Sequence, residues 1–570
     1  MNTVIFLILR QMRVPLLLLS AVYAVATWGM TVIPGVDDQG NIYYMDYFHA
    51  FYFISFMGTT IGFGEIPYEF SDAQRMWALI FIYITVATWI YTIGALINLL
   101  QNETLKRAFT EYQFRQQVSQ IMDGFYLICG YGDTGSQLVR ALRSTLTQAS
   151  VIDISQERMD ALVLEEHPMT VPGICANARD PHNLMLAGIN HPSCECVVAL
   201  TDDNAVNLHV AISAKVMNPS LKVICRADNL EVEANMASFG TDYIVDPFET
   251  FARNFAMATH APHQYQLQEW FRRESGHELT DVQQIPKGYW ILCGFGRFGQ
   301  ALHRQMTAQG MEVRVIEPDR TRSGLPKDTI YGYGTEAHTL IEADIKRAVG
   351  IIAGANDDSN NLSIIVTARE INPDLFQVVR QTEHANRALF RHCGAHIVME
   401  SSDVLATKIR TLLTCPMTDE FLSLARAHED AWALGIIEQI RRISPDRMPE
   451  IWEVAITPDT AAAVSDALAA GTEVRLEHLT HDHTDRDVGL GLIPLLHTNE
   501  KGAFCLPSQH TVLAPGDRLL FTGVYWARWK MQWNLQNAVA LHYVMTGESL
   551  PRTWFGRLLA RRRQEAEAAL

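Results

Sequence analysis

Two long apolar runs near the N-terminus place the strongest constraint on how this chain can fold. Residues 14–33 and 76–100 contain no charged side chain over 20 and 25 positions, respectively. A helix of about 20 apolar residues crosses the roughly 30 Å hydrocarbon core of a bilayer, so each run predicts a membrane span. A cleaved signal peptide is the alternative for the first run, but the apolar core of a signal peptide is shorter.

The charges around the two runs predict their orientation. Arg10 and Arg13 precede the first run, and Lys106 and Arg107 follow the second. The segment between the runs is acidic, with six Asp or Glu residues against Arg75. The positive-inside rule therefore places both termini in the cytoplasm. We expect a multi-pass protein of the inner (plasma) membrane.

Length and composition describe a folded protein of several domains. A chain of 570 residues is too long for one hydrophobic core, which predicts three or four folding units. The composition is 48% hydrophobic and 19% charged, as in globular proteins. The net charge of -17 disfavours a general nucleic-acid surface, so nucleic acid is not an expected partner.

The segment between the two runs contains "DYFHAFYFISFMGTTIGFGEIPYEF". Residues 46–57 predict a short apolar helix whose N-terminus is capped by Asp46. About 12 residues cannot cross a bilayer, so we expect a re-entrant half-helix followed by a loop that is buried in protein or faces water. In that loop Gly62 and Gly64 alternate with Ile61 and Phe63. Glycine readily adopts left-handed backbone angles, and this alternation lets successive carbonyl oxygens point the same way.

The loop resembles the selectivity filter of potassium channels, in which carbonyl oxygens replace the hydration shell of the ion. The matching residues are Thr60, Ile61, Gly62, Phe63 and Gly64. Phe63 stands where the family usually has Tyr, which removes a hydroxyl that could bind the pore helix, and Glu65 stands where the family usually has Asp. A glycine-rich turn between two helices is the alternative. The resemblance implies K⁺ in the filter and four chains around one axis.

The same resemblance implies a gate near the cytoplasmic end of the second run. Gly94 offers a flexible point, and Leu96, Ile97 and Leu100 are expected to form an apolar constriction. Residues 101–123 are polar and predict a helical connector, through which cytoplasmic domains would pull on the gate.

A glycine motif marks the first domain after the connector. "FYLICGYGDTGSQLVRAL" combines a short apolar strand, the sequence Gly130-x-Gly132-x-x-Gly135 and a helical pattern, and Asp153 ends the next apolar strand. This order of strand, glycine turn, helix and acidic strand end is typical of dinucleotide-binding folds. The glycines let the backbone approach a phosphate at the helix N-terminus.

The glycine motif occurs twice. "YWILCGFGRFGQALHRQM" supplies Gly294, Gly296 and Gly299, and Glu317 ends the following strand. The glycines and the acidic residue are both shifted by 164 positions, and further matching segments extend the repeat to about 120 residues. Alternating strands and helices predict a parallel sheet covered on both faces in each copy.

The two copies resemble the ligand-binding lobes of RCK domains, the TrkA-N-like regulators of potassium conductance, and the whole chain is similar to prokaryotic multi-ligand-gated RCK potassium channels. The expected fold is a membrane α-helical pore domain, with two spans and a re-entrant pore helix, followed by two tandem Rossmann-like α/β domains and a small C-terminal α+β lobe. The predicted boundaries are 1–100 for the pore domain, 101–123 for the connector, 124–247 and 289–400 for the two RCK lobes, 248–288 and 401–434 for two helical crossovers, 435–545 for the C-terminal lobe and 546–570 for a tail.

The acidic strand ends favour an adenine nucleotide such as NAD or ADP as a regulatory ligand, because Asp153 and Glu317 stand where an acid accepts hydrogen bonds from a ribose. Asp133 lies inside the first glycine loop, whereas Arg297, followed by Phe298, lies inside the second. A carboxylate repels pyrophosphate and a guanidinium binds it, so the second pocket is predicted to be the better phosphate site. In the alternative reading, either copy is a structural spacer with a degenerate pocket.

Two acidic pairs, Asp202-Asp203 and Asp357-Asp358, follow corresponding strands of the two copies. The resemblance makes Ca²⁺ a further candidate ligand, but capping of the next helices is the favoured interpretation, and no residue is assigned to a metal. The nine cysteines are expected to be reduced structural thiols.

These features favour a homotetrameric, potassium-selective channel gated by cytoplasmic ligands, and not an enzyme. Its expected partners are K⁺, adenine nucleotides and the lipid bilayer. A membrane-tethered NAD-dependent oxidoreductase is one alternative, which would need a catalytic acid or base beside each glycine loop and a separate substrate domain. It would also leave the filter-like loop unexplained. A regulatory subunit of a potassium uptake or efflux system is the other alternative, and the chain's own complete pore unit argues against it.

Overall fold

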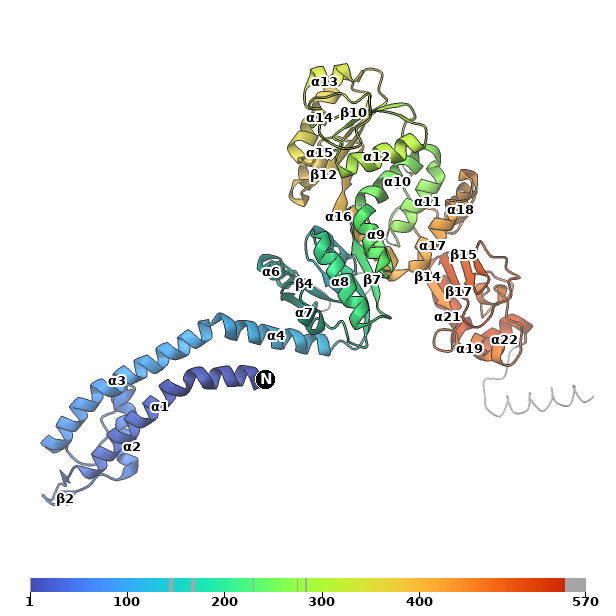
Figure 1. Cartoon of the computed structure of the whole chain (residues 1–570). Coiled ribbons are helices and arrows are strands. Elements are labelled where there is room, and N and C mark those ends of the chain that lie inside the picture. Colours follow the sequence, from blue (N-terminus) through green and yellow to red (C-terminus); the bar gives the residue numbers. More distant parts are fainter. Residues whose placement is uncertain are drawn as a thin grey trace, which may run out of the picture. The chain divides into compact units, whose positions relative to one another are not determined.

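The computed structural model (Figure 1) describes residues 2–142, 147–165, 170–228, 230–273, 275–281 and 284–548. The chain separates into two compact units, the first built mainly from Met1–Met122 and the second from most of Asp123–Leu570. The predicted tail lies outside the described residues from position 549 onward.

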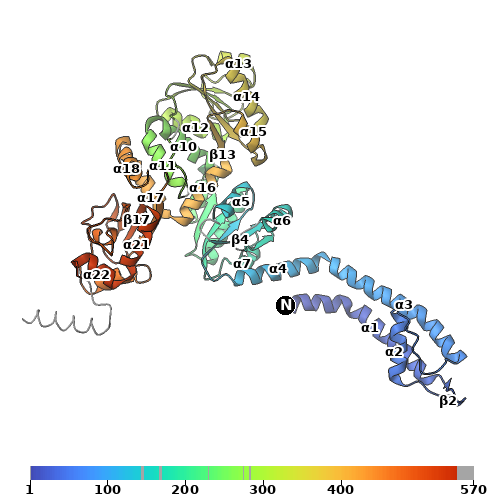
Figure 2. The same cartoon turned by 180° about the vertical axis from the view of Figure 1, so that it is seen from behind.

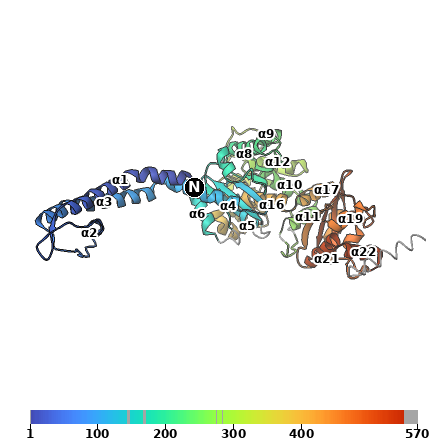
Figure 3. The ribbon, with the colours of Figure 1, turned by 90° about the horizontal axis from the view of Figure 1, so that it is seen from below.

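Two long helices form the frame of the first unit. α1 (Asn2–Val32) and α3 (Asp72–Gln101) lie side by side (Figures 1 and 3). Ile8–Val32 and Asp72–Gln101 are long and apolar enough to cross a membrane, and only 28% and 22% of their most apolar windows are buried. Such exposed apolar faces suit helices that contact lipid. The two helices predicted as spans are therefore present.

A shorter helix packs against this pair. α2 (Tyr47–Gly58) begins where predicted, because Asp46 accepts a hydrogen bond of 2.8 Å from the backbone of His49. Its apolar side chains join those of α1 and α3 in one core that includes Ala26, Met30, Phe53, Ile54 and Phe81. The remaining elements of the unit are β1 (Gly35–Val36), β2 (Ile42–Tyr43) and α4 (Glu103–Ser119).

The second unit begins with a six-stranded sheet in the order β5-β4-β3-β6-β7-β8. Numbered along the sheet's own strands this is 3-2-1-4-5-6, the order of dinucleotide-binding folds. The strands are β3 (Phe125–Cys129), β4 (Gln148–Asp153), β5 (Gly173–Cys175), β6 (Cys194–Ala199), β7 (Lys222–Arg226) and β8 (Tyr243–Val245). The helices are α5 (Asp133–Leu142), α6 (Gln156–Leu164), α7 (Pro181–Leu186), α8 (Asn204–Met217) and α9 (Leu230–Ser238).

The second copy repeats this sheet with one strand fewer. Its order is β10-β9-β11-β12-β13, and all paired strands are parallel. The third strand is reduced to a single parallel bridge between Ile316 and Ile330. The strands are β9 (Tyr289–Cys293), β10 (Glu312–Ile316), β11 (Gly350–Ala353), β12 (Phe376–Gln381) and β13 (Ile397–Glu400). The helices are α12 (Arg297–Ala308), α13 (Ala337–Glu342), α14 (Asp358–Ile371) and α15 (Arg387–His392).

The helix that follows each sheet packs on the other sheet's domain. α10 (Pro247–His260) follows the first sheet and packs on α12 of the second copy. α16 (Ser401–Thr414) follows the second sheet and packs on α5 of the first copy (Figure 2). Phe248 and Phe255 therefore share a core with Phe298, and Leu405 shares one with Leu138. This exchange of helices interlocks the two copies.

A four-stranded antiparallel sheet forms the predicted C-terminal lobe, in the order β14-β17-β15-β16. Its strands are β14 (Glu450–Ala455), β15 (Leu492–Asn499), β16 (Gly502–Cys505) and β17 (Arg518–Gly523), and its helices are α19 (Ala462–Ala469), α20 (Glu477–Thr480), α21 (Tyr525–Gln536) and α22 (Ala538–Thr546). The crossover helices α11 (Pro262–Arg272), α17 (Pro416–Ala425) and α18 (Asp430–Ile443) precede it.

The structure differs from the predicted boundary at residue 434. α18 continues through Gly435 to Ile443. Ile436, Ile437 and Ile440 are fully or almost fully buried on one face of this helix. Burial of these side chains outweighs the cost of one glycine in the helix interior, which is about 1 kcal/mol.

Candidate functional sites

The filter-like loop has an alternating backbone conformation. Thr60, Gly62 and Gly64 have φ values of 62°, 66° and 76°, in the left-handed region. A Cβ built on Gly62 or Gly64 meets no atom within 4 Å, so the backbone angle, and not lack of space, is what calls for glycine there. The side chains of Ile61 and Phe63, between them, are 61% and 65% exposed in the single chain. The loop therefore has the alternation that aligned carbonyl oxygens require.

A side-chain hydrogen bond ties the far end of this loop to the half-helix. The Tyr52 hydroxyl on α2 donates to Glu65 Oε2 at 3.1 Å. Phe63 has no hydroxyl that could donate from the loop to the half-helix. Here the donor is instead a tyrosine of the half-helix, and the acceptor is a carboxylate of the loop. The sequence comparison noted Glu65 only as a departure, and its partner on α2 lies 13 positions earlier in the chain.

The predicted gate residues lie in the last third of α3. A Cβ on Gly94 meets nothing within 4 Å in the single chain. Leu96, Ile97 and Leu100 are 45%, 49% and 61% exposed there. Their apolar surfaces are thus available to other chains or to lipid, and their role as a constriction stays a prediction.

The two glycine loops have the same geometry. Gly130 and Gly294 end their strands with φ values of 106° and 96°. A Cβ on Gly135 would lie 2.1 Å from the carbonyl oxygen of Gly130, and one on Gly299 would lie 2.1 Å from that of Gly294. The third glycine of each motif is therefore needed for close packing of helix against strand, and the first for the turn itself.

The acidic residue after each second strand braces its glycine loop. Asp153 accepts hydrogen bonds from the backbone N–H groups of Tyr131 at 2.6 Å and Ser155 at 2.8 Å. In the second copy Glu317 accepts from the backbone of Phe295 at 2.6 Å.

An arginine accompanies each of these acids. Arg158 lies 3.3 Å from Asp153, and Arg322 lies 3.6 Å from Glu317. Each carboxylate thus already has a backbone partner and a cation, and any ribose hydroxyl would share it with these groups.

A cavity of about 670 Å³ lies over the first glycine loop. The first copy contributes one wall, which includes Gly130, Gly132, Asp133, Asp153, Arg158 and Arg226. The second copy contributes Arg297, Arg380, Thr382, Ser401 and Ser402. The cavity is therefore lined by both halves of the repeat.

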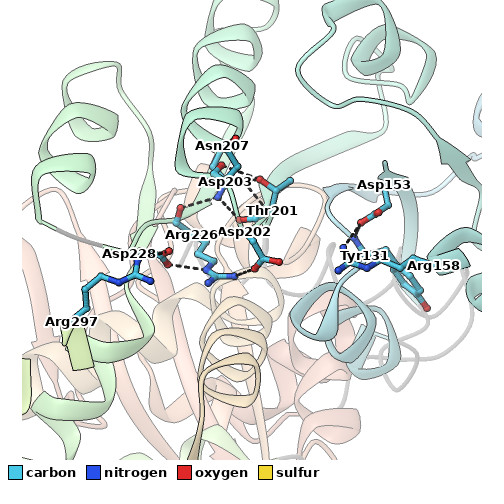
Figure 4. A network of polar contacts seen from close by, with 10 residues as sticks. All are labelled: Tyr131, Asp153, Arg158, Thr201, Asp202, Asp203, Asn207, Arg226, Asp228 and Arg297. Carbon is cyan, nitrogen blue, oxygen red and sulfur yellow. Dashed lines mark hydrogen bonds and ion pairs between the residues drawn. The ribbon is translucent and has the colours of Figure 1, made fainter. Parts of the chain in front are cut away.

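Arg297 lies on the wall of this first cavity, although the sequence assigned it to the second pocket. Its guanidinium pairs with Asp228 of the first copy at 2.7 Å (Figure 4). Asp228 also accepts from Arg226 at 3.0 Å, and Arg226 reaches Asp202 at 2.6 Å. The physical reason is the helix exchange, which turns the start of α12 toward the first sheet.

Arg380 is the second cation that the second copy brings to the cavity. It is 8% exposed, donates to Asn356 at 2.7 Å and lies 4.8 Å from the centre of the Phe248 ring. Burial lowers the pKa of Arg380 to about 10, and the positive charge of the nearby Arg297 is the second cause of this decrease. Two guanidinium groups that face the same cavity repel each other, and an anion between them relieves that repulsion.

The sequence reasoning did not single out Arg226 or Arg380, although the repeat contains the signal. The backbone carbonyl oxygens of Arg226 and Arg380 accept hydrogen bonds from Asn207 and Asn361, respectively. The two asparagines are 154 positions apart in the chain, and so are the two arginines, so Arg226 and Arg380 occupy equivalent positions in the two copies. Phe298, in contrast, was predicted as a nucleotide-site residue. Its side chain is fully buried in the core against Phe248 and does not line the cavity.

One member of each acidic pair caps a helix, as favoured by the sequence. Asp203 accepts from the backbone of Ala205 at 2.8 Å at the start of α8, and Asp357 accepts from Asn360 at 2.8 Å at the start of α14. Asp358 accepts from the backbone of Thr382 at 2.7 Å. The described residues contain no cluster of three or more His, Cys, Asp or Glu side chains suited to a metal, so no calcium ligand is assigned.

Comparison with known proteins identifies two domain families in this chain. The ion channel family matches residues 16–102, and the TrkA-N domain family matches residues 126–247 and 290–401. The solved structure named "GsuK Channel" resembles 96% of this chain and 100% of its own, with a TM-score of 0.51 and 16% sequence identity. At that identity the likeness shows a shared fold.

Two relatives are similar to parts of the chain. "Potassium channel protein 1" of Methanocaldococcus jannaschii is 24% identical over 204 residues, which is 36% of this chain and 59% of that protein. A "Trk system potassium uptake protein TrkA homolog" of Pyrococcus abyssi is 29% identical over 147 residues, 24% of this chain and 63% of that protein. The chain thus covers less than two thirds of either relative.

The predicted order of elements is confirmed by these matches and by the two sheets. An ion channel domain with two apolar helices precedes two Rossmann-like TrkA-N domains that share an interlocked core. The chain therefore belongs to the two-span ion channels that carry two tandem TrkA-N, or RCK, domains.

Proposed function

We propose that this chain is one quarter of a potassium-selective channel that is gated by a nucleotide bound to its cytoplasmic domains. The observation that carries the proposal is the alternating left-handed backbone at Thr60, Gly62 and Gly64, in a loop between a half-helix and an apolar helix. Rings of carbonyl oxygens from four such loops would coordinate K⁺. The names of the relatives, a potassium channel and a potassium uptake protein, favour K⁺ as the ion.

An adenine nucleotide such as ADP or NAD is the ligand that we propose for the cavity over the first glycine loop. Gly130 and Gly132 let a phosphate approach the N-terminus of α5, where backbone N–H groups favour an anion. Arg297 and Arg380 face the same space from the second copy. This proposal moves the better phosphate site from the second copy, where the sequence placed it, to the first.

The proposed gating depends on the fact that residues of both copies line this cavity. A ligand shifts an equilibrium only if it binds one state more tightly than the other. A nucleotide that contacts both copies binds best when Arg297 and Arg380 stand close to the first glycine loop. We propose that binding selects this arrangement and that the connector passes the change to the pore.

Calorimetry tests the ligand directly. Titration of ADP or NAD into the detergent-solubilised full-length protein is expected to show saturable binding, with tighter binding for the nucleotide than for inorganic phosphate. Heats that do not saturate for either nucleotide would contradict a nucleotide site.

The filter requires four chains, so a tetramer is the expected assembly. The mass of the protein in detergent, corrected for bound detergent, should be four times the chain mass of 64.1 kDa. A stable monomer or dimer in a bilayer-like detergent would argue against a ring of four loops.

Replacing Tyr52 with Phe should destabilise the filter-like loop. The change removes the hydrogen bond that the hydroxyl donates to the Glu65 carboxylate, which ties α2 to the end of the loop. We expect a K⁺ current that declines during sustained opening, measured in planar bilayers. Tyr47→Phe, on the same helix with a 68% exposed side chain, is the control and should behave as the parent. A steady parental current from Tyr52→Phe would show that this bond has no role in the loop.

Two other functions fit parts of the chain. An oxidoreductase would use the nucleotide as a hydride carrier, and it predicts turnover of reduced nucleotide with a substrate. The similarity to a TrkA homologue is the one observation that favours a regulatory subunit of an uptake system. The ion channel match at residues 16–102 in the same chain favours a channel over both.

A further inference from the structure

The end of the half-helix is confined by the two long helices. Gly58 is the last residue of α2, and a Cβ built on it would lie 2.6 Å from the Tyr23 hydroxyl oxygen and 3.4 Å from Thr85 Cβ. Tyr23 belongs to α1 and Thr85 to α3. Since Gly58 has an ordinary helical conformation, glycine is needed here for close approach and not for its backbone angle.

Tyr23 is itself held by α3. The indole N–H of Trp89 donates to the Tyr23 hydroxyl oxygen at 2.5 Å. Thr85 lies one turn before Trp89 and is fully buried. Gly58, Tyr23 and Trp89 therefore form a contact of three helices, which we name the Gly58 lock.

The first residues of the filter-like loop are hydrogen-bonded to the last turn of α2, next to the Gly58 lock. The backbone N–H groups of Thr59, Thr60 and Ile61 donate to carbonyl oxygens of Ser55, Met57 and Phe56, at 3.1, 3.1 and 3.0 Å. These acceptors are in the last turn of α2. A displacement of the end of α2 therefore displaces the start of the loop.

We infer that Tyr23 and Trp89 are positioning residues for ion selectivity, because the Gly58 lock fixes where the filter begins. The inference rests on the proposed channel function. Trp89 also lies five residues before Gly94 on α3, so the lock joins the filter to the same helix that carries the predicted gate.

A pair of compensating substitutions tests the lock. Gly58→Ala should place its methyl group against the Tyr23 hydroxyl, and overpacking of this kind is expected to lower the K⁺ over Na⁺ permeability ratio roughly ten-fold. Tyr23→Phe removes the hydroxyl and the Trp89 bond, with an expected fall of about three-fold. In the double variant the 2.6 Å overlap with the hydroxyl is gone, and the nearest ring carbon of residue 23 lies 3.3 Å from the new methyl, a tight contact that a shift of a few tenths of an ångström accommodates. Its ratio should match that of Tyr23→Phe alone.

Trp89→Phe and Trp77→Phe form a matched pair. Both tryptophans lie on α3 and donate to α1, but Trp77 donates to the Ala26 carbonyl oxygen at 3.1 Å and not to Tyr23. Trp89→Phe should lower the permeability ratio by the same factor as Tyr23→Phe, and Trp77→Phe should leave it unchanged. Because these variants keep an aromatic ring, they give a result even if Gly58→Ala fails to assemble.

The outcomes separate the lock from the channel function. A selective parent channel whose Tyr23→Phe and Trp89→Phe variants keep the parental ratio would overturn the lock alone. The lock would also be overturned if the permeability ratio of the Gly58→Ala/Tyr23→Phe double variant fell by the product of the two single-variant factors, because the two residues would then act independently. A parent channel without K⁺ selectivity would overturn the proposed function and the lock with it.

Discussion

Gly62→Ala is expected to abolish potassium selectivity or the current itself, while the TrkA-N domains stay folded. Gly62 has a φ of 66°, and an L-residue with a side chain in the left-handed region costs about 1–2 kcal/mol. In a tetramer four loops would carry this strain at one ring of carbonyl oxygens. Bi-ionic reversal potentials in planar bilayers measure the selectivity, and circular dichroism checks the fold.

Gly40→Ala is the matched control for this change. Gly40 also has a left-handed backbone, with a φ of 83°, and a Cβ on it likewise meets nothing within 4 Å. It lies between β1 and β2, 20 positions before Thr60 in the chain. The control should conduct like the parent. Parental selectivity in Gly62→Ala would show that residues 60–64 are not the filter.

Arg297→Glu is expected to weaken nucleotide binding at the first cavity by roughly ten- to hundred-fold. The change removes a charge-assisted contact of about 1.5–3 kcal/mol and adds a carboxylate on the cavity wall, where Asp133 already contributes one. Asp133→Arg should leave binding unchanged or make it tighter, since it removes a repulsion. Calorimetry with ADP and NAD on the full-length protein measures both.

Arg304→Glu separates the cavity from the interface between the two copies. Arg297 and Arg304 both lie on α12, and both form ion pairs with carboxylates of the first half, Asp228 and Glu249. Only Arg297 lines the cavity. Arg304→Glu should therefore bind nucleotide like the parent. Equal losses in both variants would mean that Arg297 acts through the interface and not on the ligand.

The repeat explains why so much of the fold of the two TrkA-N domains was predictable. The first and third glycines of each motif have a local physical cause, such as the 2.1 Å approach that Gly135 and Gly299 permit, so spacing alone identifies the strand-turn-helix unit. The start of the half-helix was equally local, because Asp46 caps it.

The cavity was not predictable in the same way. Its second wall comes from Arg297 and Arg380, more than 150 positions from Gly130 along the chain. They reach it because α10 and α16 exchange domains, and no local pattern records which copy a helix packs on. The sequence assigned Arg297 to the second pocket, whereas in the structure it lies on the wall of the first cavity. Phe298 was assigned to the second nucleotide site because it lies beside a glycine loop, and its side chain is buried against Phe248.

The central claim is most directly tested by one recording in a planar bilayer. The purified protein is placed between K⁺ and Na⁺ solutions, and ADP or NAD is added to one side at a time. We predict a reversal potential close to that of K⁺ and an open probability that changes only when nucleotide is on the side of the TrkA-N domains. A reversal potential near zero, or a selective current that ignores both nucleotides on either side, would contradict the account.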